Sequence, residues 1–172
     1  MADVKKGADL VAVALASTYR TYLPGEIDAI NAAWNDAATV PALTYPKKYF
    51  SERRLEVPES VCLMVGMLGA RQTANGAYSS QVGWGSMAYE FEVTLWLKGD
   101  KLHILERMAR RYGQAMWEVL MKYQSLDGSV PGQTGVDLIE MGMNPAPFGE
   151  AAPMTLIYAV GWRGVVYVEQ SV

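Results

Sequence analysis

Few side chains in this chain of 172 residues could carry out chemistry. His103 is its only histidine and Cys62 its only cysteine. A catalytic triad needs a histidine beside a nucleophile and a carboxylate, and a histidine-based metal site needs several histidines. A hydrolase that uses His103 with an acidic partner is therefore one alternative. A surface histidine without a catalytic role is the simpler interpretation.

Glu90 and Glu92 stand two residues apart. On a strand both side chains would project from the same face, where they could act as acid and base. Solvated carboxylates on a sheet surface explain them without any chemistry. The sequence contains no phosphate-binding loop, dinucleotide fingerprint, Cys-x-x-Cys pair or calcium loop. We therefore expect no enzyme, no catalytic residue, no cofactor and no metal site.

The composition also bears on the possible partners. The formal net charge of −3 argues against a general nucleic-acid-binding protein, which normally carries a strongly basic face. No window approaches the ~20 apolar residues that a membrane-spanning helix needs. Because there is one cysteine, no disulfide can form within the chain, and Cys62 is expected to be a buried thiol. We expect neither a membrane nor a specific nucleic-acid sequence as a partner.

The most regular pattern lies in residues 87–124, which we interpret as the core of the domain. Apolar side chains at alternate positions predict a strand with one buried face. These positions are Tyr89, Phe91, Val93, Leu95 and Leu97. The apolar spacing then changes to three and four, which predicts an amphipathic helix over residues 102–123 with Asp100 as its N-cap. The short connection would let this helix fold back across the sheet.

The N-terminal region, residues 1–36, is predicted to be a helical hairpin. Apolar residues at helical spacing predict a first helix over residues 6–23, which Pro24 and Gly25 would end. A shorter helix over residues 26–36 would follow. The prolines and mixed aromatic and charged residues of 37–58 indicate an irregular surface segment.

The remaining pattern, in residues 59–172, predicts further strands joined by loops. Residues 60–68 are apolar at consecutive positions, which is typical of a strand buried on both faces. A glycine-rich polar loop is expected over residues 69–86, and turns or loops over 126–135 and 144–153. Two more strands are expected over 136–143 and 154–168, the last with a bulge or bend at Gly161 and Gly164. The whole chain is thus predicted to be one α+β domain, a mostly antiparallel sheet with a long helix and the helical hairpin packed on it.

Two features favour a protein partner. Glu90 and Glu92 lie on the predicted strand, and the predicted helix carries a basic group of three residues. They are Arg107, Arg110 and Arg111. Opposite charges on two faces would suit head-to-tail association of subunits, whereas local pairs within the helix would explain them equally well. Strands apolar on both faces also need cover on the side without helices, from the hairpin, from a second sheet layer or from an adjoining subunit.

The order of these elements resembles the small tail-terminator and tail-completion proteins of long-tailed bacteriophages. The resemblance covers most of the chain and is based on element order and hydrophobic pattern. Its carriers are the N-terminal helical segment, the entry at Tyr45-Pro46, the strand at residues 61–65, the long polar loop, the strand beginning at Tyr89, the helix over residues 102–123 and the strand after Pro153.

The resemblance implies a structural virion protein without enzymatic activity. Such proteins form a ring, commonly a hexamer, at the head-proximal end of the tail, where they end tube assembly and join the tail to the neck. The implied partners are further copies of the chain, the tail tube protein, the head connector or neck protein, and the sheath protein. The implied location is the virion, and the host cytoplasm during assembly. The longer N-terminal helical segment leaves a neck or sheath-associated role as an alternative.

Two sites follow from this resemblance as hypotheses. The subunit interface would join Glu90 and Glu92 of one copy to the basic helix residues of the next. The long loop would contact the tail tube. Its candidate residues are Arg71, Gln72, Asn75, Tyr78 and Trp84. A ligand-binding α+β module, with an apolar pocket under the long helix, is a further alternative.

Overall fold

The computed structural model describes residues 7–34, 36, 38–54, 61–73, 84–145 and 156–171, and all structural statements below concern these residues. Two long helices and five strands form an α+β fold, which confirms the predicted class. In chain order the elements are α1 (Ala8–Ala33), β1 (Lys48–Phe50), β2 (Cys62–Thr73), β3 (Trp84–Gly99), α2 (Leu102–Lys122), the 3-10 turn η1 (Leu126–Gly128), β4 (Gln133–Pro145) and β5 (Leu156–Ser171).

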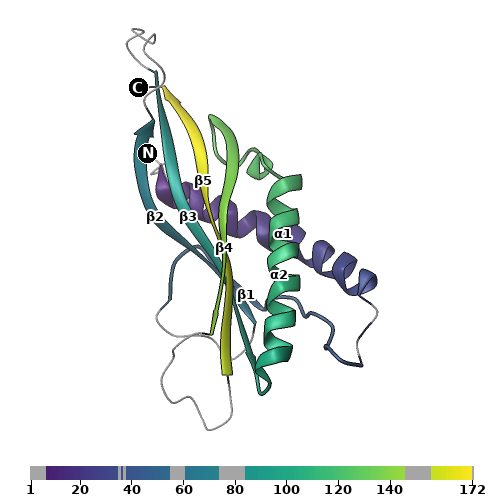
Figure 1. Cartoon of the computed structure of the whole chain (residues 1–172). Coiled ribbons are helices and arrows are strands. Elements are labelled where there is room, and N and C mark those ends of the chain that lie inside the picture. The colour runs from purple at the N-terminus through teal and green to yellow at the C-terminus, as the bar shows by residue number, and fades with distance from the viewer. Residues whose placement is uncertain are drawn as a thin grey trace.

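The strands form one sheet in the order β1-β2-β3-β5-β4. The short β1 runs parallel to β2, and every other neighbouring pair is antiparallel. Both helices pack against the same face of the sheet (Figure 1), α1 mainly against β2 and α2 mainly against β5. We call this helix-covered side the inner face and the opposite side the outer face.

The alternate apolar residues predicted for β3 lie on the inner face. Phe91, Val93 and Leu95 are completely buried between the sheet and the helices. From the helix side, the Tyr19 hydroxyl donates a hydrogen bond to the carbonyl oxygen of Met116 at 3.2 Å. The buried polar group is thus satisfied, and the same bond ties α1 to α2.

The predicted N-terminal hairpin is wrong, because α1 is one continuous helix with Pro24 inside it. Proline in a helix interior removes one hydrogen bond and costs about 3 kcal/mol. Leu23, Ile27 and Ile30 nevertheless lie on one buried stripe that continues through this position. Burying each such side chain contributes about 1.5–3 kcal/mol, so a continuous buried stripe outweighs the local break.

Several predicted boundaries also move. β2 continues to Thr73 and β3 begins at Trp84, so both ends of the predicted loop 69–86 are strand, while residues 74–83 lie outside the described residues. The cause is mutual pairing, since Ala70 lies opposite Tyr89 in this extension. The predicted irregular segment 37–58 contains β1. The N-cap of α2 is Lys101 and not Asp100, and no side chain caps the helix.

The strands predicted near the C-terminus are present and longer than predicted. β4 begins at Gln133, inside the predicted turn region, and its last two residues extend into the predicted loop 144–153, whose remainder lies outside the described residues. The bulge expected at Gly161 or Gly164 lies in the neighbouring strand instead, because β4 shifts register between Leu138 and Glu140. Gly164 has a different role, since a Cβ there would come 2.5 Å from the Asp137 carbonyl oxygen.

Candidate functional site at the outer face and edges of the sheet

A row of charged side chains crosses the outer face. Glu92 of β3 lies opposite Arg163 of β5, and Arg163 lies opposite Glu140 of β4, so strand register places the three in one line. Arg53, from the segment after β1, forms an ion pair with Glu92 across the same face. A Cβ at Gly66 would collide with the Arg53 side chain, so that side chain lies directly over β2.

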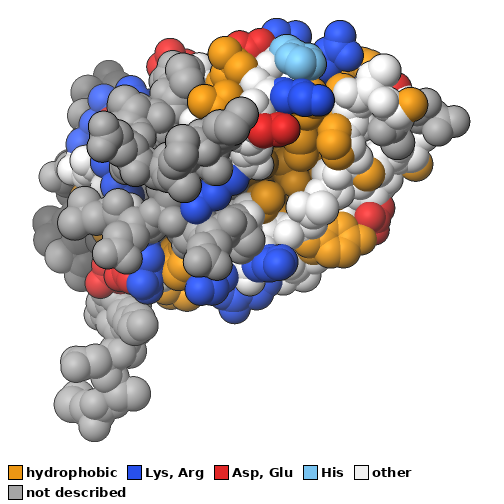
Figure 2. Space-filling view, turned by 90° about the horizontal axis from the view of Figure 1, so that it is seen from below, with side chains coloured by type: hydrophobic (Ala, Val, Ile, Leu, Met, Phe, Trp, Pro, Cys, Tyr) orange, Lys and Arg blue, Asp and Glu red, His pale blue; other side chains and the backbone are white. Residues whose placement is uncertain are grey.

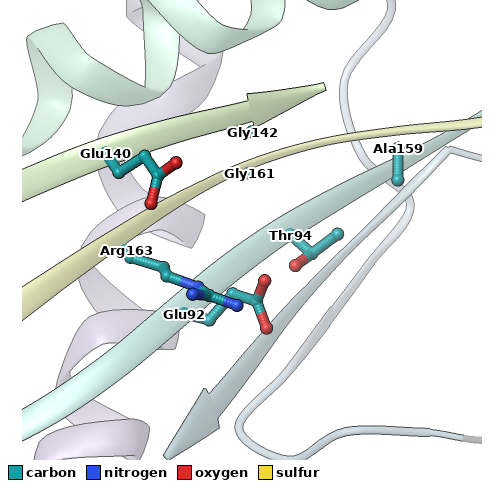
Figure 3. A pocket seen from close by; sticks show the side chains of 7 residues that line it. All are labelled: Glu92, Thr94, Glu140, Gly142, Ala159, Gly161 and Arg163. Carbon is teal, nitrogen blue, oxygen red and sulfur yellow. The ribbon is translucent and has the colours of Figure 1, made fainter. Parts of the chain in front are cut away.

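A hollow of about 210 Å³ lies beside this row (Figure 3). Its floor consists of small residues on two adjacent strands, because Gly142 of β4 and Ala159 and Gly161 of β5 leave space that larger side chains would fill. Glu92, Thr94, Glu140 and Arg163 complete the lining. This volume is below the roughly 300 Å³ at which small-molecule sites begin. The hollow suits a single side chain of a partner better than a ligand or substrate.

The outer edge of the sheet is formed by β4. Among the described residues β4 pairs only with β5, so the backbone groups on its other side have no strand partner. Ile139, the extra residue at the bulge, is 67% exposed, and Met141 is 39% exposed. Met141 also contacts α2, because a Cβ on Gly113 would lie 2.7 Å from its sulfur atom. An exposed edge strand with large apolar side chains is a typical site for pairing with another chain.

The opposite edge is only partly covered. β1 pairs with β2 at Cys62, Leu63 and Met64, and no other described strand adjoins that side of β2. The uncovered stretch carries a bulge between Met67 and Gly69, and the intervening Leu68 is 41% exposed. Within the part of the chain that the structure describes, the sheet therefore has two open edges, each with an exposed apolar residue at a bulge.

The residues predicted for the two sides of the subunit interface lie on β3 and α2. Glu92 is paired with Arg53, and Glu90 lies 3.4 Å from Arg71. Arg111 is buried on the inner side, where its Nη2 donates to the Asp36 Oδ2 at 2.6 Å, so it does not belong to an exposed basic group with the other two arginines. Arg107 and Arg110 are exposed on α2 and remain available.

The ion pair of Arg111 explains why this residue turns inward. Its guanidinium also lies 4.7 Å from the centroid of the Trp34 ring, so the charge is held by a carboxylate and an aromatic face together. The hydrogen bond from Arg111 lowers the pKa of the Asp36 carboxyl below its ordinary value. Sequence spacing on α2 alone gives no signal for this contact, because Asp36 lies far away in the chain.

The predicted tube-contact loop is described only at its two ends. Arg71 is exposed near the end of β2. The backbone of Gln72 belongs to β2 and that of Trp84 to β3. Asn75 and Tyr78 lie outside the described residues. The hypothesis that this loop binds a tail tube stays a prediction.

The chain's single histidine, His103, and its single cysteine, Cys62, do not line the hollow. His103 is exposed at the start of α2, and Figure 2 shows it on the surface beside basic side chains. Cys62 is buried, as predicted, and burial raises the pKa of its thiol to about 11. Neither lines the hollow, whose hydroxyl group belongs to Thr94.

Sequence reasoning missed the row formed by Arg163 and Glu140 with Glu92. The one available signal was the polar residue Arg163 between Gly161 and Gly164 in an apolar strand. The described residues contain no group of three or more histidine, cysteine or acidic side chains placed to hold a metal ion. No helix among them is long and apolar enough to cross a bilayer.

Comparison with models of protein families and with curated proteins finds no match for this chain.

Proposed function

We propose that this chain is a non-enzymatic structural protein that assembles with copies of itself into a ring at the head-proximal end of a bacteriophage tail. There it would end tube assembly and join the tail to the neck. Its partners would be the tail tube protein, the head connector or neck protein, and the sheath protein. Its location would be the virion. The resemblance in element order supports the phage assignment. The α+β class predicted from the same elements is the observed one.

The observation that carries the self-assembly part is the open edge of β4. No strand among the described residues pairs with the outer side of these 13 residues, which also carry the exposed side chains of Ile139 and Met141. Proteins that remain monomeric usually protect such an edge with lysine, proline, a β-bulge or a covering element. The β4 edge has no lysine and has Pro145 only at its end, and its bulge leaves the large apolar side chain of Ile139 exposed.

The first experiment is the mass of the purified full chain in solution, measured by light scattering over a range of concentrations and salt. We expect a closed oligomer, or a concentration-dependent step toward one, because each copy presents open edges. Samples that stay monomeric should be mixed with purified tail tubes and viewed by electron microscopy, since a ring can require the tube as its template. A chain that remains monomeric alone and does not cap tubes would contradict the proposal.

A further inference from the structure

The two open edges of the sheet lie on opposite sides of the molecule (Figure 1), and their strands run in opposite directions. β2 is antiparallel to β3, β3 to β5, and β5 to β4, so β2 and β4 are antiparallel to each other. If two copies stand side by side in the same orientation, β4 of one meets β2 of the other as an antiparallel pair. Such a pair can form the regular perpendicular hydrogen bonds of an antiparallel sheet.

The charges at the two edges are of opposite sign. Arg71 of β2 lies opposite Ala88 of β3, which is on the same face of β3 as Glu90. Arg71 is therefore on the outer face. Asp137 and Glu140 are exposed on β4. The contact of Arg71 with Glu90 involves Nε at 3.4 Å, and its side chain stays 66% exposed. Its charge is therefore largely available at the β2 edge.

The signs of the charges at the two edges favour one of the possible edge pairings over the others. Joining β4 to β4 would bring the acidic residues of two copies together, and joining β2 to β2 would bring together two copies of Arg71. Like charges across neighbouring strands destabilise a sheet, whereas opposite charges stabilise it. Only the unlike pairing, β4 with β2, places Arg71 near Asp137 or Glu140.

We propose that β4 of one copy pairs with the uncovered part of β2, from Val65 to Thr73, in the next copy. This inference depends on the proposed self-assembly and specifies its contact. The bulge residues Ile139 and Leu68 would supply the apolar part of the junction, and Arg71 with the acidic pair the polar part. Because the two surfaces differ, the contact is head-to-tail. It gives a closed ring when the rotation between copies closes.

Two variants block one edge each. Ile139→Lys with Glu140→Lys places positive charge on β4 and leaves β2 intact. Leu68→Lys with Arg71→Glu alters β2 and leaves β4 intact. A lysine on an edge strand opposes pairing, so we expect each variant alone to lose the oligomer. Val13→Lys is the control, because Val13 of α1 is exposed to the same extent as Leu68 and belongs to neither edge strand; this variant should assemble like the unmodified chain.

Mixing the two edge variants at high concentration gives the sharpest test. Each retains one intact edge, so the mixture should form dimers that cannot grow, while each variant alone stays monomeric. A dimer of the β2 variant alone would show β4 pairing with itself and overturn the inference, as would a mixture that stays monomeric.

The failure of this inference is distinguishable from failure of the proposed function. Rings that persist in both edge variants would overturn the β2–β4 junction and leave ring formation established. A monomeric unmodified chain that also fails to cap tail tubes would overturn both. Thermal unfolding of each variant shows whether its monomer is folded. If the β4 double variant is unfolded, Glu140→Lys alone replaces it, and if the β2 double variant is unfolded, Arg71→Glu alone replaces it. Roughly tenfold weaker association is the expected result for either single variant.

Discussion

The two faces of the sheet are built from alternate residues of the same strands and have opposite properties. On the inner face, Phe91 and Leu95 are completely buried beneath the helices. On the outer face, Thr94 and Gly161 border a hollow between charged side chains. Around the hollow, a period of two therefore separates side chains that stabilise the fold from side chains that are available for contacts. Elsewhere on the outer face Met64, Ala88 and Val165 are buried. The two open edges lie between these faces. We assign assembly to them because their backbone groups have no strand partner among the described residues.

The largest expected difference between the faces comes from two adjacent residues of β3. Leu95→Ala should lower the free energy of unfolding by about 2–5 kcal/mol, because it removes a fully buried side chain and leaves a cavity. Thr94→Ala, on the outer face, should change it by less than about 0.5 kcal/mol. Urea unfolding of the monomeric protein measures both. Equal decreases in the free energy of unfolding for the two variants would mean that the outer face is packed as tightly as the inner face.

The sequence predicted the inner face well, because its information is local. Alternation in β3 and helical spacing in α2 each lie within one element, and both follow from burial on one side. Pro24 misled the prediction, since a local break in the pattern said nothing about the buried stripe that continues past it. The extension of β2 to Thr73 was equally hidden, because its stabilising partner strand lies on the far side of a loop.

The outer face could not be predicted in the same way. The row of Glu92, Arg163 and Glu140 exists only through the registers of three strands, which no short stretch of sequence specifies. The inward turn of Arg111 has a similar cause, because its carboxylate partner, Asp36, lies on the segment after α1. A charged residue on a predicted helix is expected at the surface, but the contact with Asp36 buries Arg111.

A second prediction concerns the floor of the hollow, where Gly161 of β5 lies opposite Gly142 of β4. A Cβ at Gly161 would lie 2.8 Å from the Val93 carbonyl oxygen, so Gly161→Ala should destabilise the fold by about 1–3 kcal/mol. Gly142 has open space in the same direction, and Gly142→Ala should be neutral within about 0.5 kcal/mol. Thermal unfolding of the matched pair tests whether tight packing reaches the outer face next to β3. If both variants unfold like the unmodified protein, the backbone there has more room than this geometry allows.

The smallest effects are expected from the ion pairs, one on each side of the sheet. On the helix side, Arg111 is buried and lowers the pKa of Asp36 from its ordinary value of 3.8. A carboxyl with a lowered pKa in the folded state stabilises the protein above its unfolded pKa, and this contribution is lost as pH falls through the folded value. Asp36→Asn should therefore lower the unfolding temperature at pH 7. Below pH 4 the unfolding temperature of this variant should fall less steeply than that of the unmodified protein.

The pair of Arg53 and Glu92 on the outer face is the matched control. The Arg53 side chain is 59% exposed, and exposed pairs contribute about 0.2–1 kcal/mol at most, because solvent screens them. Glu92→Gln should leave the unfolding temperature and its acid dependence nearly unchanged. Calorimetric scans from pH 3 to pH 7 on both variants measure the difference. An acid dependence altered equally by both substitutions would show that the outer-face charges stabilise the fold as the partly buried pair of Arg111 and Asp36 does. In that case, the outer row would be a structural element instead of a surface open to a partner.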